Sequence, residues 1–211
     1  MARPRSKTND VHTDCKTLAP IWEDLAETFS NEPNVLVAKV DAEAENSKAT
    51  AKEFGVSSYP TIKFFPKGST KAVDYEGGRR EENFVSYLNE NAGTHRVAGG
   101  GLDELAGTIE AIDEIVTKYI GGSHTLTDAA AAAKKAAESL KEQAQYKYAE
   151  YYIRVFDKLA KSDGYAAKEF GRLDGIIKKG GLAPTKLDEL SSKVNILRKF
   201  VNKVTGEKDE L

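Results

Sequence analysis

The hydrophobic pattern of this 211-residue chain changes at a glycine-rich stretch, residues 92–101. Before this stretch, helical spacing alternates with short runs typical of strands; after it, apolar residues recur only at steps of three and four. The stretch contains Gly93, Gly99, Gly100 and Gly101 and predicts a flexible linker. A chain of this length can form two small domains, each with its own core. The sequence therefore predicts an α/β domain followed by an all-helical bundle.

Six elements and a hairpin turn are predicted before the linker. They are a helix over 16–30, a buried β-branched strand over 35–40, a helix from Ala44 to Phe54, strands at Thr61–Phe65 and Lys71–Tyr75 around Lys67-Gly68-Ser69, and a helix with Phe84, Val85 and Leu88 inside. After the linker we expect four or five short helices. They are Leu105–Tyr119, Asp128 to about Lys141 with Thr125 or Thr127 as cap, Tyr146–Leu159, a shorter one around Phe170–Ile177, and a last one that begins at Pro184.

The single cysteine, Cys15, lies in a distinctive motif. The chain reads His12-Thr13-Asp14-Cys15-Lys16-Thr17-Leu18-Ala19-Pro20, and later Ser58-Tyr59-Pro60-Thr61. This order resembles the active-site domain of the protein disulfide-isomerase family, where Cys-Gly-His-Cys-Lys-x-Leu-Ala-Pro faces a cis proline. His12 stands where that family has its first cysteine. The resemblance implies a thioredoxin-like α/β fold.

The resemblance also implies roles for individual residues. In the family the first cysteine attacks the client disulfide and the second resolves the intermediate, so Cys15 holds the resolving position. Without a second thiol we expect no dithiol turnover; a half-buried, inert thiol is the alternative for Cys15. Tyr59 and Pro60 would form the client-binding edge, with a cis bond between them, whereas the alternative is a trans proline that starts a strand. Arg79 matches an arginine that favours the thiolate, and a solvated arginine at a helix start is its alternative.

The thioredoxin-like part is expected to lack its beginning. In the family the central strand precedes the active-site motif, whereas residues 1–11 are polar and show no strand character apart from Val11. Two interior strands would then have unpaired backbone edges. We therefore expect residues 1–91 to fold poorly alone or to recruit a partner strand.

The second half resembles the all-helical C-terminal domain that follows thioredoxin-like domains in D-type disulfide isomerases and in a redox-inactive ER chaperone. The resemblance rests on the Leu105–Ile120 helix, the aromatic segment Tyr148–Arg154 and the closing helix Leu187–Val201. The predicted organisation is a polar N-terminus over 1–11, a partial thioredoxin-like domain over 12–91, the linker over 92–101, the helical domain over 102–204 and a tail over 205–211.

The tail ends in Lys208-Asp209-Glu210-Leu211, a retrieval signal of the endoplasmic reticulum that a receptor reads. The first ten residues contain no apolar stretch typical of a signal peptide, so we expect the chain to be a fragment or a wrongly started gene product. The net charge of −2 gives no reason to expect nucleic acid as a partner, and no apolar run is long enough to insert into a membrane.

No cofactor or metal is expected. His12, Asp14 and Cys15 are types that ligate zinc, but a fourth ligand is not visible. The favoured function is that of a disulfide-isomerase family member in the ER lumen, which assists disulfide formation and rearrangement in unfolded or disulfide-containing secretory proteins. The alternatives are a redox-inactive chaperone or escort and a non-functional fragment. Whether the chain is itself an enzyme, and whether it forms a homo-oligomer, stays open.

Overall fold

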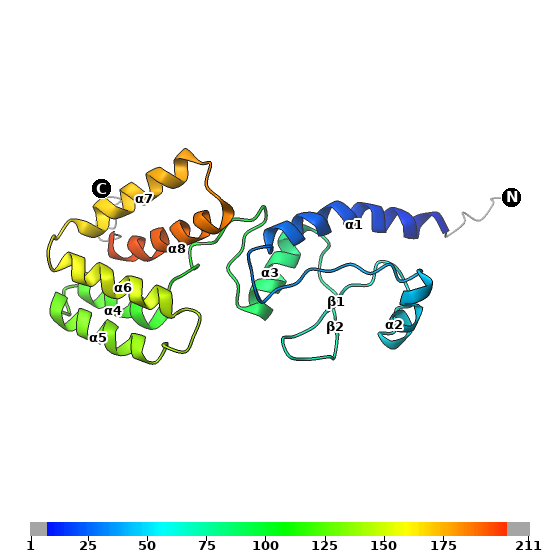
Figure 1. The fold of residues 1–211 in the computed structure, drawn as a ribbon, viewed down its shortest axis with the longest axis horizontal. Coiled ribbons are helices and arrows are strands. Elements are labelled where there is room, and N and C mark those ends of the chain that lie inside the picture. Colours follow the sequence, from blue (N-terminus) through cyan, green and yellow to red (C-terminus); the bar gives the residue numbers. More distant parts are fainter. Residues whose placement is uncertain (1–7, 202–211) are drawn as a thin grey trace, which may run out of the picture. The chain divides into compact units, whose positions relative to one another are not determined.

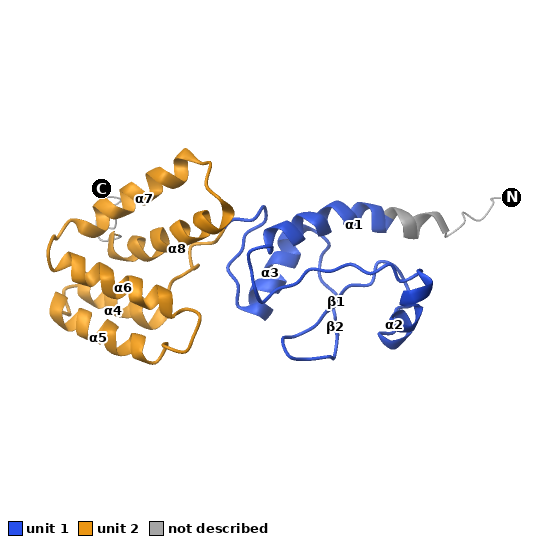
Figure 2. Ribbon diagram, in the orientation of Figure 1, with its two compact units in different colours: residues 1–101 blue, residues 102–211 orange. Residues whose placement is uncertain are grey.

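The structure is a computed structural model that describes residues 8–201, with side chains from Asp14 onward. The chain divides into two compact units, residues 1–101 and 102–211, which are coloured separately in Figure 2. The boundary follows Gly101, the last residue of the glycine-rich stretch. The first unit contains helices and two strands, whereas the second contains helices, as the patterns predict.

The first unit is built from short elements, labelled in Figure 1. In chain order they are α1 (Thr8–Thr28), η1 (Glu45–Ser47), α2 (Lys48–Glu53), β1 (Lys63–Phe64), β2 (Val73–Asp74) and α3 (Glu81–Ala92). The strands β1 and β2 pair antiparallel, with Lys63 opposite Asp74 and Phe64 opposite Val73. The predicted hairpin is therefore present, although each strand is shorter than predicted.

Residues 35–40 do not form the predicted buried strand, and that prediction is wrong. Val35 and Val37 are half-buried against the core of the unit, but Leu36 is 89% exposed and Val40 is 65% exposed. An extended segment becomes part of a sheet only where a neighbour completes its ladder of hydrogen bonds. Among the described residues β1 pairs with β2 alone, and this segment is instead tied to α1 by a bond from Trp22 Nε1 to the Ala38 carbonyl, 3.1 Å.

The core of the first unit lies between α1 and α3. It consists of Leu18 and Leu25 from α1, of Phe29 directly after this helix, and of Phe84 and Val85 from α3. Leu18 and Leu25 are seven residues apart, which places them on one face of the helix. Phe84 and Val85 are buried as predicted. These two helices therefore form the framework on which the loops of the unit are held.

The glycine-rich stretch is not the free linker that its composition predicts. Its Arg96 is buried, with Nε 2.7 Å from the Glu32 carboxylate and Nη1 3.2 Å from the Gly100 carbonyl. The Gly99 amide donates to the Glu81 carboxylate, 3.0 Å. A buried cation needs a partner, and Glu32 supplies it. The expectation of flexibility is therefore corrected, because this arginine anchors the stretch to the first unit.

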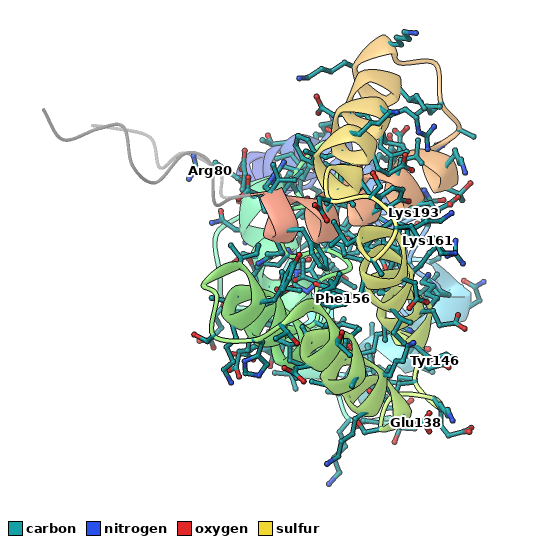
Figure 3. The ribbon with its side chains drawn as sticks, turned by 90° about the vertical axis from the view of Figure 1, so that its left-hand side faces the viewer. Arg80, Glu138, Tyr146, Phe156, Lys161 and Lys193 are labelled. Carbon is teal, nitrogen blue, oxygen red and sulfur yellow. The ribbon has the colours of Figure 1, made fainter. Side chains whose placement is uncertain are left out.

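The second unit is a bundle. Its helices are α4 (Glu110–Ile120), α5 (Leu126–Glu138), α6 (Tyr146–Leu159), α7 (Tyr165–Lys179) and α8 (Pro184–Val201). Figure 3 shows Phe156 inside the bundle and Glu138 and Lys161 at its surface, in agreement with their burial. The amphipathic pattern of the second half therefore buries one face of each helix against its neighbours.

The alanine run of the second half lies in α5, as predicted. Ala129, Ala133 and Ala137 follow each other at steps of four and are buried. Their small side chains let α5 lie close to α4 and α6, both of which it contacts. Of the two candidate caps, Thr125 is the one used: its hydroxyl accepts a hydrogen bond from the Asp128 amide, 3.2 Å.

The first helix of the bundle begins later than predicted. Leu105 was expected to open it, but α4 begins at Glu110 and Leu105 is exposed. The Asp103 carboxylate accepts hydrogen bonds from the amides of Leu105 and Ala106, at 2.8 and 3.0 Å. A side chain that binds the backbone in this way favours a turn over a helix. Helical spacing alone does not reveal this competition.

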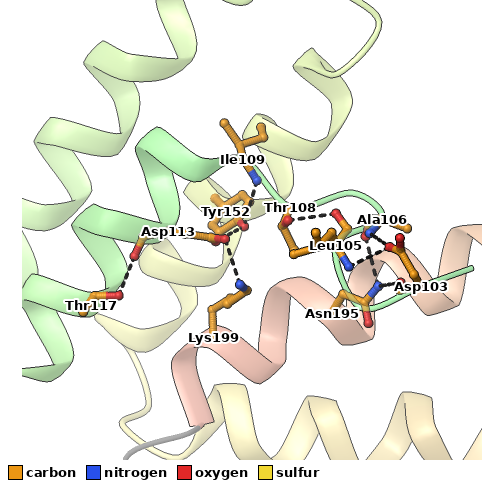
Figure 4. A network of polar contacts seen from close by, with 10 residues as sticks. All are labelled: Asp103, Leu105, Ala106, Thr108, Ile109, Asp113, Thr117, Tyr152, Asn195 and Lys199. Atoms are coloured by element: carbon orange, nitrogen blue, oxygen red, sulfur yellow. Dashed lines mark hydrogen bonds and ion pairs between the residues drawn. The ribbon is translucent and has the colours of Figure 1, made fainter. Parts of the chain in front are cut away.

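A polar network, drawn in Figure 4, fastens this turn to the bundle. The fully buried Tyr152 hydroxyl donates to the Asp113 carboxylate and accepts from the Ile109 amide, 3.3 Å. Lys199 Nζ lies 3.0 Å from the other Asp113 oxygen. Asn195 donates to the carbonyls of Asp103 and Ala106, at 2.8 and 3.1 Å. Burial, followed by the bond to Asp113, raises the pKa of Tyr152 far above its ordinary value. Tyr152 therefore stays a neutral donor.

Candidate functional site around Cys15

Cys15 lies inside α1 and is half-buried. It follows Thr8, the first residue of the helix, by about two turns. The favourable field of a helix N-terminus is confined to the first turn, so side chains must supply any charge that acts on this thiol. His12 belongs to the same helix, but its side chain lies outside the described residues.

A charged pair lies next to the cysteine. Arg79 Nη1 is 3.6 Å from the carboxylate of Asp14, the residue that precedes Cys15. The two side chains are 51% and 60% exposed, so the pair is screened by solvent and contributes less than about 1 kcal/mol. The fold thus brings together Arg79 and the cysteine motif, two features that were singled out separately in the sequence. A catalytic role for either residue stays a prediction.

Arg79 is presented by a tight turn formed by Gly77 and Gly78, called here the Gly77–Gly78 turn. The Tyr75 hydroxyl donates to the Gly78 carbonyl, 2.8 Å. A Cβ at Gly77 would overlap that hydroxyl, and a Cβ at Gly78 would overlap the Asn83 amide. A side chain at either glycine would therefore force Tyr75 or Asn83 to move. The sequence analysis missed Tyr75 and Asn83, although two glycines directly before a candidate arginine were the available signal.

Tyr75 is itself held in place. Its ring lies 5.0 Å from the rings of Phe84 and Tyr87, and its amide donates to the Ile62 carbonyl, 3.0 Å. Burial, followed by the nearby Tyr87, raises the pKa of Tyr75 above its ordinary value. The hydroxyl is thus a neutral, fixed donor that faces the turn.

The peptide bond between Tyr59 and Pro60 is cis, as predicted. Both residues are half-exposed in the loop before β1. None of the hydrogen bonds or ion pairs between described residues joins Tyr59 or Pro60 to Cys15 or Arg79. The structure therefore bears out the conformation, while the client-binding role of these two residues remains a prediction.

The described residues contain no group of three or more histidine, cysteine or acidic side chains placed to hold a metal ion. The zinc alternative at His12, Asp14 and Cys15 depends on a histidine whose side chain is outside that part of the chain. The predicted retrieval signal also lies outside the described residues, at Lys208, Asp209, Glu210 and Leu211. Within residues 8–201, every helix is too short or too polar to cross a lipid bilayer.

Two family models match the chain, one for each unit. The Thioredoxin model matches residues 10–90. The model of the endoplasmic reticulum protein ERp29, C-terminal domain, matches residues 107–200. The first match covers Cys15, Pro60 and Arg79, and the second covers α4 to α8 almost completely. The α/β and all-helical fold classes are thereby confirmed.

Several disulfide isomerases are similar to this chain. Protein disulfide-isomerase erp38 of Neurospora crassa is 62% identical over 198 residues, which is 93% of this chain and 53% of the relative. Protein disulfide-isomerase tigA of Aspergillus niger is 58% identical over 197 residues, 93% of this chain and 52% of the relative. A probable protein disulfide-isomerase A6 of Medicago sativa is 37% identical over 187 residues, 88% of this chain and 50% of the relative.

The chain spans about half the length of these curated relatives. Both units align in one stretch, in the order in which the two family models match. Within that stretch the chain has one cysteine, so its active site is incomplete by the standard of a two-cysteine motif. With its thioredoxin unit followed by an ERp29-type helical unit, the chain belongs to the protein disulfide-isomerase family.

Proposed function

We propose that this chain takes part in the rearrangement of disulfides in secretory proteins, with Cys15 as its single reacting thiol. The observation that carries the proposal is the position of Cys15 next to the Asp14–Arg79 pair, within a unit shared with proteins named disulfide isomerases. The thiolate is the reacting form of a cysteine, and Arg79 places a positive charge beside the residue that precedes Cys15.

One thiol suffices for isomerisation without net oxidation. The Cys15 thiolate attacks one sulfur of a client disulfide; that bond breaks, a Cys15–client disulfide forms, and the other client sulfur leaves as a thiolate. A second client thiolate then attacks the mixed disulfide, which closes a new client disulfide and returns Cys15 as a thiolate. Because Cys15 is half-buried and has no resolving partner in this chain, release depends on the client, and we expect slow turnover.

The proposal is tested with a small protein whose disulfides have been scrambled. The full chain is expected to give a mixed disulfide, visible by non-reducing mass spectrometry, and a slow recovery of native pairing. Cys15→Ser should give neither. His12→Cys, which places a second thiol three residues before Cys15, should speed release of the adduct. Equal behaviour of the unchanged chain and Cys15→Ser would remove the proposal.

A binding module without redox chemistry is the second candidate, favoured by one observation. The first unit exposes several large apolar side chains, among them Leu36, Val40, Phe65 and Val73. Exposed apolar surface is able to bind unfolded proteins. In this case Cys15→Ser should suppress the aggregation of a reduced, unfolded client as well as the unchanged chain does. Loss of suppression in Leu36→Ser, but not in Leu105→Ser of the second unit, would assign the activity to this surface.

The lumen of the endoplasmic reticulum is the proposed site of action, with secretory clients and the retrieval receptor as partners. The proposal is supported by the terminal Lys208-Asp209-Glu210-Leu211 and by the match to a domain of an endoplasmic reticulum protein. Expression behind a secretory leader, followed by fractionation with and without these four residues, tests it. Retention that is independent of the four residues would contradict the role of the signal.

A further inference from the structure

We propose that Tyr75 is a positioning residue: its hydroxyl holds the Gly77–Gly78 turn, and the turn holds Arg79 against Asp14 beside Cys15. The proposal deepens the proposed function, on which it rests, because it names the group that controls the charge next to the reacting thiol.

The first step is the balance of charge at the cysteine. Asp14 precedes Cys15 directly, and its carboxylate repels an anion that approaches the thiol. Arg79, 3.6 Å from this carboxylate, offsets its charge. If Arg79 moves away, the uncompensated Asp14 remains beside the thiol. The position of Arg79 therefore affects the reactivity of Cys15 even without direct contact.

The second step is how Arg79 is held. Both ends of this ion pair are exposed, and a long exposed side chain loses entropy when it adopts one geometry. The backbone that carries it must therefore be well placed. The Tyr75 hydroxyl bonds to the carbonyl of Gly78, which is the peptide group joined to Arg79. On the far side, the Arg80 amide donates to the Asn83 side chain, 3.4 Å.

The third step is the rigidity of the donor. The Tyr75 ring contacts Phe84 and Tyr87 of α3, and Phe84 in turn packs on Trp22 of α1, with ring centroids 5.5 Å apart. The aromatic contacts thus connect the donor to both helices of the core. A Cβ at Gly77 or Gly78 would overlap Tyr75 or Asn83, so the two glycines let these side chains lie directly against the turn. The Tyr75 hydroxyl, Gly77 and Gly78 together fix the backbone position of Arg79, and this arrangement is called the clamp below.

The test uses the full chain and its single thiol, without any client. Cys15 is alkylated with iodoacetamide, which is neutral, and with iodoacetate, which is an anion, and the ratio of the two rates is measured. A cation near the thiol favours the anionic reagent, so we expect Tyr75→Phe to lower the iodoacetate-to-iodoacetamide ratio about twofold and Arg79→Gln about threefold, within the range of an exposed pair. A change that only loosens the fold would alter both rates in parallel and leave the ratio unchanged.

Matched variants separate the clamp from other effects. Tyr87→Phe removes a hydroxyl from the same aromatic cluster but does not alter the bond to Gly78, and should leave the ratio unchanged. Gly78→Ala disturbs the turn from the Asn83 side and should lower the ratio even if Tyr75→Phe proves poorly folded. In the Arg79→Gln background, Tyr75→Phe should have no further effect.

Two results would overturn the inference. The first is an unchanged ratio in both Tyr75→Phe and Gly78→Ala while Arg79→Gln lowers it, because Arg79 would then act without the clamp. The second is an unchanged ratio in Arg79→Gln, because no charge would then reach the thiol. Since these rates need no client, they fail independently of the mixed-disulfide experiment that tests the proposed function.

Discussion

The two units of this chain differ in how far their own residues complete their cores. In the helical unit one buried cluster draws on α4, α5, α6, α7 and α8. In the thioredoxin unit, the buried cluster consists of Leu18, Leu25, Phe29, Phe84 and Val85, and the extended segment over 35–40 borders it without pairing. A helix satisfies its backbone hydrogen bonds internally, whereas a strand requires a neighbour. The difference teaches that a helical pattern is sufficient to predict a helix, whereas a strand pattern predicts a strand only where a neighbouring segment pairs with it.

The same substitution in each unit should produce very different losses, which is the largest effect we expect. Phe156→Ala removes a buried ring that packs on Tyr119 and Phe200, and should cost about 4 kcal/mol of unfolding free energy. Phe65→Ala, at an exposed ring of the thioredoxin unit, should cost about 1 kcal/mol. Thermal unfolding followed by far-UV circular dichroism measures both. Comparable losses of unfolding free energy in the two variants would contradict the difference between the two units.

The thioredoxin unit should depend on a contact that its glycine-rich stretch makes. Arg96→Met leaves Glu32 without its buried partner and should destabilise this unit by about 3 kcal/mol. Fluorescence of Trp22, the single tryptophan and a residue of this unit, reports its unfolding in denaturant. Arg198→Met breaks a more exposed pair with Glu104 in the helical unit and should cost less than about 1 kcal/mol. Equal losses of unfolding free energy in Arg96→Met and Arg198→Met would mean that the glycine-rich stretch is not anchored by Arg96 and acts as a free linker.

The helical unit should lose less when a polar contact is removed than when its core is opened. Tyr152→Phe keeps the ring but deprives Asp113 and the Ile109 amide of the hydroxyl, which should cost about 2 kcal/mol. Calorimetry of the full chain gives the shift of the helical transition. Tyr148→Phe, a half-buried tyrosine on the same helix, serves as the control and should change stability little. No loss in Tyr152→Phe would mean that the network is incidental.

The smallest expected effect is a dependence on acid in the helical unit. Hydrogen bonds from Lys186 and Lys193 lower the pKa of Glu189 from 4.5 to about 2. A carboxylate whose folded pKa is lowered contributes stability above its ordinary pKa, and this contribution disappears as the pH falls from 4.5 towards about 2. Glu189→Gln should therefore weaken the dependence of the melting temperature on pH over that range. The effect should be small because the group is exposed. Glu150→Gln, at an exposed position of α6, is the control and should keep the slope.

Much of the helical unit was predictable from single residues. Thr125 caps α5 and Pro184 begins α8, as their chemistry favours. Leu105 was the exception, since the Asp103 side chain turns the backbone before α4 begins. In the thioredoxin unit, the cis bond before Pro60 followed from the family resemblance. The strand at 35–40 did not form, because no described segment pairs with it.

The candidate site divides in the same way. Cys15, Pro60 and Arg79 were found from sequence motifs, whereas Tyr75 and Asn83 were not, because their importance depends on which atoms approach the Gly77–Gly78 turn. The Asp14–Arg79 pair joins two positions that are far apart along the chain. No local sequence pattern predicts an ion pair between residues so far apart in the chain.

By itself the sequence determined the family, the helices and the single thiol, because motif spacing and amphipathic periodicity are properties of neighbouring residues. Tertiary structure alone decided that Arg96 is buried against Glu32, that residues 35–40 stay unpaired, and that the Tyr75 hydroxyl faces the turn before Arg79. The first two depend on which segments meet only after the chain has folded, and the third depends on the packing of the Tyr75 ring against α3. Burial and charge at a given residue are set by what surrounds it in space, and its neighbours in the chain supply only part of that environment.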